Sequence, residues 1–180
     1  NFLVNNAGFG GTVKFSEMSA ELVDKMMNLN IKATTHMMNR FIPMLKENSP
    51  SNILNVSSLI SNQTAPYKAL YTATKTYVRN LSVSLAYELK NDGVSVSVLL
   101  PGATPTNDVV THQIEKGNFA AKASVMSAHK VAKISIEKAL KGVILITTGT
   151  KNGVIRRLLS YMPSKTIASI AINQYKKQNK

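Results

Sequence analysis

A tyrosine and a lysine in this sequence are spaced for joint proton chemistry. Tyr71 precedes Lys75 by four residues, and residues four apart on a helix project from one face, one turn above the other. An ammonium held beside a phenol favours the phenolate and lowers the pKa of the tyrosine. Such a tyrosine can donate and accept a proton near neutral pH. Alone, the spacing is a weak signal, since two surface residues of an amphipathic helix show it equally well.

Three further motifs accompany this pair in a defined order. Residues 5–8 read Asn-Asn-Ala-Gly, residues 55–58 read Asn-Val-Ser-Ser, and residues 101–106 read Pro-Gly-Ala-Thr-Pro-Thr. In this order the motifs resemble those of the short-chain dehydrogenase/reductase family. The resemblance extends from Asn5 to about Thr106 by motif, and to Thr150 by pattern.

The resemblance implies a catalytic set of Asn30, Ser58, Tyr71 and Lys75. Tyr71 would be the general acid in carbonyl reduction and the general base in alcohol oxidation. Ser58, at the family's usual spacing before the tyrosine and therefore preferred to Ser57, would hydrogen-bond the carbonyl oxygen. Lys75 would lower the pKa of Tyr71 and bind the nicotinamide ribose, and Asn30 would hold a water on the proton path.

The same resemblance implies NAD or NADP as cofactor and a small carbonyl compound or alcohol as substrate. It places these residues at the cofactor: Asn5, Asn6, Ala7, Gly8, Tyr71, Lys75, Pro101, Gly102, Thr104 and Thr106. The basic balance of the chain slightly favours NADP. No metal site is indicated, because the sequence lacks cysteine and its three histidines are far apart. The alternative is a non-catalytic cofactor-binding or scaffold protein of the same fold, since fold does not determine function.

The expected fold is α/β, a Rossmann-like doubly wound parallel sheet with helices on both faces. In the family a first strand, a glycine-rich turn and a helix hold the cofactor pyrophosphate, and these N-terminal strands and this turn are absent from the sequence. Residues 8–13 superficially match G-x-G-x-x-G, but Val13 takes the last glycine position, so we interpret them as a flexible loop beside the active site. We therefore expect residues 1–150 to form the C-terminal two-thirds of one domain, with residues 151–180 as a basic helical extension of it.

The hydrophobic pattern predicts the elements that must position these residues. Strands are predicted at residues 2–4, 53–57, 94–100 and 143–148, and helices at 19 to beyond 38, 68–90 and 127–142. Pro43 is expected to kink or interrupt the first helix. Residues 104–126, which include Gly117 and Asn118, resemble the family's mobile substrate-covering segment.

An apolar stripe on the helix predicted at residues 68–90 suggests how subunits would pair. The stripe consists of Val78, Leu81, Leu85 and Leu89. Members of the family often pair through this helix, so the resemblance implies a homodimer or a homotetramer.

Charge is unevenly distributed along the chain. The formal net charge is +13, and no acidic residue follows Glu137. Nucleic-acid binding is not expected, since the sequence lacks interleaved aromatic residues and any known module. Apolar residues within 154–162 share a helical face, with Arg156 and Arg157 opposite. We interpret this region as packing on the domain or on another subunit of a cytoplasmic protein; the alternative is weak, peripheral contact with an anionic membrane surface.

Overall fold

The computed structural model describes residues 1–106, 108–115 and 122–178. Its centre is a parallel sheet with the strand order β1-β2-β3-β4. The strands are β1 (Phe2–Asn5), β2 (Ser51–Val56), β3 (Val94–Leu100) and β4 (Leu145–Thr147). Parallel neighbours require a crossover between consecutive strands, and helices provide it. The predicted parallel sheet with alternating strands and helices is confirmed.

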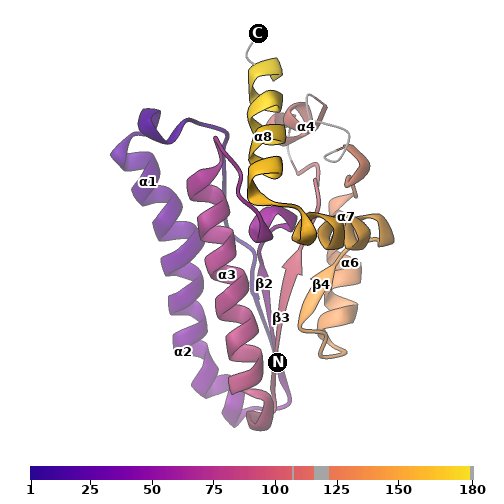
Figure 1. Cartoon of the computed structure of the whole chain (residues 1–180). Coiled ribbons are helices and arrows are strands. Elements are labelled where there is room, and N and C mark those ends of the chain that lie inside the picture. The colour runs from indigo at the N-terminus through magenta and orange to yellow at the C-terminus, as the bar shows by residue number, and fades with distance from the viewer. Residues whose placement is uncertain (107, 116–121, 179–180) are drawn as a thin grey trace.

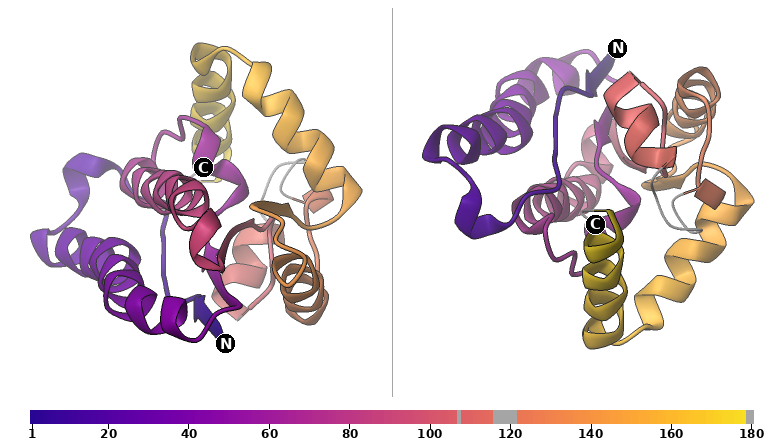
Figure 2. Two further views of the ribbon diagram at one scale, coloured as in Figure 1. Left: turned by 90° about the horizontal axis from the view of Figure 1, so that it is seen from below. Right: turned by 90° about the horizontal axis from the view of Figure 1, so that it is seen from above.

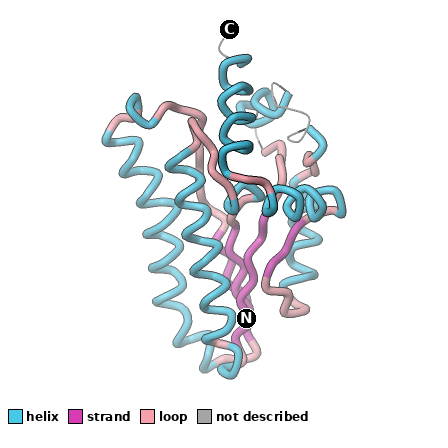
Figure 3. The backbone as a smooth tube through the Cα atoms, viewed as in Figure 1, coloured by secondary structure: helices cyan, strands magenta, loops and turns pink. Residues whose placement is uncertain are grey.

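Helices lie on both faces of this sheet (Figure 1 and Figure 2). They are α1 (Ala20–Met27), α2 (Thr34–Glu47), α3 (Ala69–Glu88), α4 (Asp108–Glu115), α6 (Ala128–Ala139), α7 (Thr150–Tyr161) and α8 (Ser164–Gln178). The pair α2 and α3 packs on one face of β2 and β3, and α6 packs on the other. Figure 3 shows the strands between these layers. None of the described helices is both long and apolar enough to cross a membrane.

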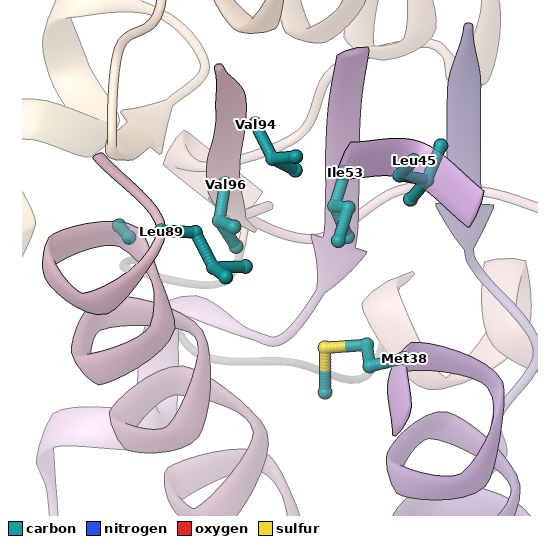
Figure 4. Close-up of a cluster of buried hydrophobic side chains, with 7 residues drawn as sticks. Met38, Leu45, Ile53, Leu89, Val94 and Val96 are labelled. Carbon is teal, nitrogen blue, oxygen red and sulfur yellow. The ribbon is translucent and has the colours of Figure 1, made fainter. Parts of the chain in front are cut away.

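Two buried apolar clusters hold the helices to the sheet. The cluster under α2 and α3, shown in Figure 4, consists of Met38, Leu45, Ile53, Ala86, Leu89, Val94 and Val96. The cluster under α6 consists of Leu54, Leu99, Val131, Ala139 and Ile146. Both strands also bury polar side chains between the two clusters, namely Ser51 and Asn55 of β2 and Ser97 of β3.

The first predicted helix runs through α1 and α2 without the interruption expected at its proline. Ser19 caps it, since its Oγ accepts a hydrogen bond from the Leu22 backbone N at 3.2 Å. Pro43 lies inside α2, which continues to Glu47, so an interruption at Pro43 is wrong. The lost backbone donor is tolerated because Leu45, beyond the proline, is anchored in the core.

The apolar stripe of α3 faces the interior of the domain. Val78 and Leu89 are buried, and Leu81 and Leu85 pack half-buried against the cluster under α2 and α3. The stripe therefore packs mainly on the sheet and its neighbouring helix, and only Leu81 and Leu85 remain partly uncovered. Self-association stays a prediction.

Three of the sequence motifs emerge at one edge of the sheet. Residues 6–8 follow β1, residues 57 and 58 follow β2, and residues 101–106 follow β3. The strands are parallel and in register, with Asn5 paired to Asn55 and Val56 to Leu99. Ligands of open α/β sheets bind outside the carboxyl ends of the strands. Within the predicted segment 104–126, Gly117 and Asn118 lie outside the described residues.

A buried asparagine connects this edge to both helices of one layer. Asn55 is fully buried; its Oδ1 accepts a hydrogen bond from Asn5 Nδ2 at 2.7 Å. Its Nδ2 donates to Ser82 Oγ at 2.8 Å and to Met38 Sδ at 3.0 Å. Because a buried amide is costly unless it is hydrogen-bonded, these contacts determine the orientation of Asn5 as well.

We predict that Asn55→Ala lowers the free energy of unfolding by about 1–3 kcal/mol, because it leaves a cavity and unpaired polar groups. Chemical denaturation measures this difference. Asn39→Ala, at an exposed position of α2, is the matched control and should change stability by about 0.5 kcal/mol or less. Equal stability of the two variants would show that the Asn55 connection is unimportant.

Candidate active site

Tyr71 and Ser58 lie together at the carboxyl edge of the sheet. Tyr71 is in the first turn of α3, and Ser58 follows β2. Burial raises the pKa of Tyr71 above its ordinary value, and a hydrogen bond with Ser58 opposes this by favouring the phenolate. Burial is the larger effect. Tyr71 is therefore a neutral phenol, able to donate a proton, at neutral pH.

Lys75 lies one turn beyond Tyr71 and is itself buried. Its Nζ donates a hydrogen bond to the Val56 carbonyl oxygen at 2.9 Å. Burial disfavours the ammonium and lowers the pKa of Lys75 to about 8. Lys75 was expected to lower the pKa of Tyr71. In the structure burial raises that pKa, and the effect that opposes burial comes from Ser58.

The two adjacent serines have different environments. Ser57 is buried and its Oγ donates to the Lys75 backbone oxygen at 2.6 Å. That bond ties α3 to the end of β2. Ser58 is half-buried and is the serine whose hydroxyl meets Tyr71.

A π-helical turn over Asn28–Ala33 carries Asn30 into the site. Such turns inside α-helices are frequent at functional sites. Asn30 is buried; its Oδ1 accepts from the Phe9 backbone N at 3.1 Å, and its Nδ2 donates to the Phe9 oxygen at 2.9 Å and to Thr74 Oγ1 at 3.0 Å. The amide thus joins the loop after β1 to α3, a connection that the sequence motifs did not indicate.

The glycines of this loop allow it to lie directly on the site. A Cβ added to Gly8 would be 3.0 Å from both Asn30 Oδ1 and Lys75 Nζ. A Cβ added to Gly10 would be 2.4 Å from the Tyr71 ring, so only glycine fits there. The loop therefore lies beside Tyr71 and Lys75, as the sequence predicted.

The other residues of the predicted cofactor set surround the same edge. Asn6, Ala7, Gly8 and Thr106 are exposed, whereas Asn5, Pro101, Gly102 and Thr104 are half-buried. The Lys75 ammonium has three donors, and Val56 accepts one of them. Spare donors beside an exposed loop of small residues suit the hydroxyl groups of a ribose. Among the described residues, no three His, Cys, Asp or Glu side chains form a potential metal site.

Two buried residues that support the loop after β3 were missed in the sequence analysis. The Ala103 backbone N donates to Ser124 Oγ at 3.0 Å. Asn152 Nδ2 donates to the Ser124 oxygen at 3.1 Å and to the Thr148 oxygen at 2.8 Å. Neither Ser124 nor Asn152 belongs to a local sequence motif, so only the folded structure shows that they support this loop.

An apolar pocket of about 40 Å³ adjoins Tyr71. Its lining includes Phe9, Val13, Met18, Leu22 and Tyr67. Tyr67 has a φ of 66°, a conformation that non-glycine residues adopt rarely and often at functional sites. Its ring stacks on Tyr175 of α8, with ring centroids 3.7 Å apart. The C-terminal helix therefore contacts the wall of the pocket.

Comparison with known proteins agrees with this geometry. A 3alpha-hydroxysteroid dehydrogenase from Mediterraneibacter gnavus is 35% identical over 109 residues, which cover 61% of this chain and 44% of that protein. A 7beta-hydroxysteroid dehydrogenase structure has a TM-score of 0.81 at 18% identity, covering 94% of this chain and 66% of the other. A short chain dehydrogenase from Burkholderia cenocepacia in complex with NADP has a TM-score of 0.75 at 23% identity, covering 89% and 66%.

These likenesses confirm the expected Rossmann-like fold. The chain spans less than half the length of the curated relatives that it matches. The sequence model of the family described as short chain dehydrogenase matches residues 1–116, which is more than half of the chain. The chain therefore belongs to the short chain dehydrogenase family.

Proposed function

We propose that the protein is an NAD(P)-dependent oxidoreductase that interconverts a carbonyl and an alcohol. The observation that carries this proposal is the meeting of three groups at the carboxyl edge of the sheet: the buried Tyr71 phenol, the Ser58 hydroxyl that favours its phenolate, and the Lys75 side chain one turn further along α3. A module that only binds a cofactor has no need of a proton donor paired with a second hydroxyl. Family membership supports the cofactor assignment, as does the NADP complex of a structural relative. The basic balance of the chain leads us to favour NADP over NAD.

In this proposal the chain positions a carbonyl oxygen and supplies its proton. Ser58 hydrogen-bonds the oxygen and holds it within reach of Tyr71, which donates the phenolic proton. The bound nicotinamide supplies or accepts the hydride. Because burial keeps Tyr71 protonated at neutral pH, reduction is the direction for which the site is prepared. Oxidation would require the phenolate and should increase at alkaline pH.

Lys75 and Asn30 orient these groups. The Lys75 ammonium would bind the cofactor ribose through the donors that Val56 leaves free. Asn30 holds the loop after β1 on the site through both main-chain groups of Phe9. Asn5–Gly8 and the segment from Pro101 to Thr106 would line the cofactor at the ends of β1 and β3.

The lining of the pocket beside Tyr71 supports a proposal about the substrate class. Its walls are largely apolar side chains, among them Phe9, Val13 and Leu22. An apolar wall stabilises a ligand by removing apolar surface from water. We therefore propose that the reacting carbonyl belongs to a predominantly apolar compound.

We predict that Tyr71→Phe lowers kcat for NAD(P)H-dependent ketone reduction roughly 100-fold or more, since a positioned general acid contributes about 10²–10⁴-fold. Binding of NADPH, measured by calorimetry, should be largely retained. The matched control is Tyr77→Phe, at an exposed position of the same helix, which should leave kcat unchanged. If Tyr71→Phe turned over at the wild-type rate, the mechanism would be refuted. If the unaltered protein bound dinucleotide but showed no turnover, the non-catalytic alternative would be favoured.

A second prediction concerns the pH dependence of reduction. With a pKa of about 8, Lys75 is charged below that pH and loses its proton above it. The ratio kcat/KM should therefore fall as pH rises through about 8. Lys75→Met should lower this ratio at neutral pH and remove that inflection, whereas Lys90→Met, at an exposed position, should preserve it. An unchanged pH profile in Lys75→Met would assign the inflection to another group.

We also propose that α7 gives the protein weak affinity for anionic lipid surfaces. The apolar residues of α7 divide between two faces, instead of sharing one as expected. Ile155 and Leu159 are half-buried, whereas Val154, Leu158 and Tyr161 are 57%, 62% and 78% exposed. These three recur at helical spacing, in a region of the chain that contains no acidic residue. Exposed apolar side chains among basic residues suit a negatively charged bilayer surface.

We predict that Leu158→Ser reduces sedimentation of the protein with vesicles containing phosphatidylserine at low salt. The matched control is Leu140→Ser after α6, which removes a leucine of similar exposure, 61%, from another surface. Salt should weaken the wild-type binding because it screens surface charge. Equal sedimentation with anionic and neutral vesicles would contradict the proposal.

A further inference from the structure

A second, polar pocket lies on the neighbouring face of α3. Its volume is about 320 Å³, and it is lined by residues 61–64, by Thr76 and Arg79 of α3, and by Ser164 at the start of α8. It shares no lining residue with the apolar pocket beside Tyr71. None of the residues that line this pocket takes part in the proposed proton transfer.

Hydrogen bonds hold the walls of the polar pocket in place. Thr76 Oγ1 donates to the Ser61 backbone oxygen at 2.7 Å. Thr64 Oγ1 donates to the Ser164 backbone oxygen at 3.4 Å, which joins the loop after β2 to the C-terminal helix. The pocket is thus assembled from three separate parts of the chain.

Several buried polar atoms of the lining residues have no hydrogen-bond partner in the described structure. They are Ser61 Oγ, Asn62 Oδ1, Gln63 Nε2 and Arg79 Nε. Ser61 is only 1% exposed. Buried polar groups in folded proteins are almost always hydrogen-bonded, and exceptions call for a bound partner or another specific cause. Three of these atoms carry hydrogen that can be donated, and Asn62 Oδ1 is an acceptor.

The charge around the polar pocket is positive. Arg156 of α7 lies close enough to Arg79 to lower its pKa, in addition to the larger effect of burial. The Nε of Arg156 also lacks a partner. Neither arginine belongs to an ion pair among the residues that the structure describes. The N-terminus of α8 at Ser164 adds the positive end of a helix dipole.

We propose that the polar pocket binds an oxyanion of the phosphate class that also carries a hydroxyl donor. Arg79 and Gln63, which line the pocket, would donate to its oxygens, the nearby charge of Arg156 would add electrostatic attraction, and Asn62 Oδ1 would accept from its hydroxyl. Hydrogen phosphate has this chemistry, as do phosphate monoesters in their singly protonated form. A phosphate group also presents oxygens that a guanidinium can bind in pairs. The ligand would neutralise two arginines that otherwise repel each other.

The test is calorimetric titration of purified protein with inorganic phosphate, at constant ionic strength maintained with chloride. Wild type should bind phosphate, and Arg79→Gln should weaken the affinity about tenfold or more because a charge-assisted hydrogen bond is lost. Arg157→Gln is the matched control, since it removes the same charge at an exposed position of α7. The phosphate affinity of Arg157→Gln should be within about twofold of the wild-type affinity, because salt screens the charge of a distant surface residue. Equal weakening in both variants, or no binding by wild type, would overturn the proposal.

Three further measurements separate the remaining explanations. Arg156→Gln provides a second route to the same loss of affinity if Arg79→Gln does not fold. Tyr71→Phe should retain phosphate binding, which distinguishes the polar pocket from the proposed catalytic site. Glycerol phosphate and vesicles containing phosphatidic acid distinguish a soluble ligand from a lipid headgroup. Competition of either with inorganic phosphate identifies the source, and competition by neither would contradict a phosphate-ester site.

Discussion

Packing of the first turns of α3 against the carboxyl edge of the sheet determines both the position and the protonation of the site residues. Ser57 ties the Lys75 backbone to the end of β2, and Lys75 Nζ bonds the last carbonyl of the same strand. The desolvation that follows raises the pKa of Tyr71 and lowers that of Lys75. One contact between helix and sheet therefore yields a neutral phenol beside an ammonium that titrates near neutrality.

The loop after β1 depends on that packing. Asn30 reaches it from a π-helical turn and bonds both main-chain groups of Phe9, while also bonding Thr74 of α3. Gly10 then lies directly on the Tyr71 ring. The closed loop contributes to the burial that dominates the tyrosine pKa, so local backbone geometry and proton chemistry are linked.

The C-terminal helices belong to the same arrangement. Asn152 of α7 supports the loop after β3 through Ser124, and Tyr175 of α8 stacks on Tyr67 at the apolar pocket. Arg156 of α7 lies near Arg79 of α3 at the polar pocket. Residues far from the family motifs thus shape the surroundings of both pockets.

Much of the architecture could be predicted from local sequence. The strand at residues 94–100 and the cap at Ser19 were correct, because hydrophobic periodicity and capping chemistry act over a few residues. Motif order likewise identified the family, since three of the motifs lie at the carboxyl ends of parallel strands and the fourth, Tyr71 with Lys75, begins the helix α3. Sequence pattern alone did not decide whether Pro43 would end its helix, or how much of the α3 stripe faces the sheet. There, packing against the sheet decided whether the helix continued and which face was covered.

The sequence by itself determined the fold class, the family and the identity of the residues that meet at the edge of the sheet. Only the tertiary structure decided what Ser57 contacts, in which direction the pKa of Tyr71 is shifted, and how Asn30 is used. The reason is physical. Residue types and spacing specify which groups are present, whereas burial and hydrogen-bond partners depend on segments that are distant in the chain and adjacent only after folding.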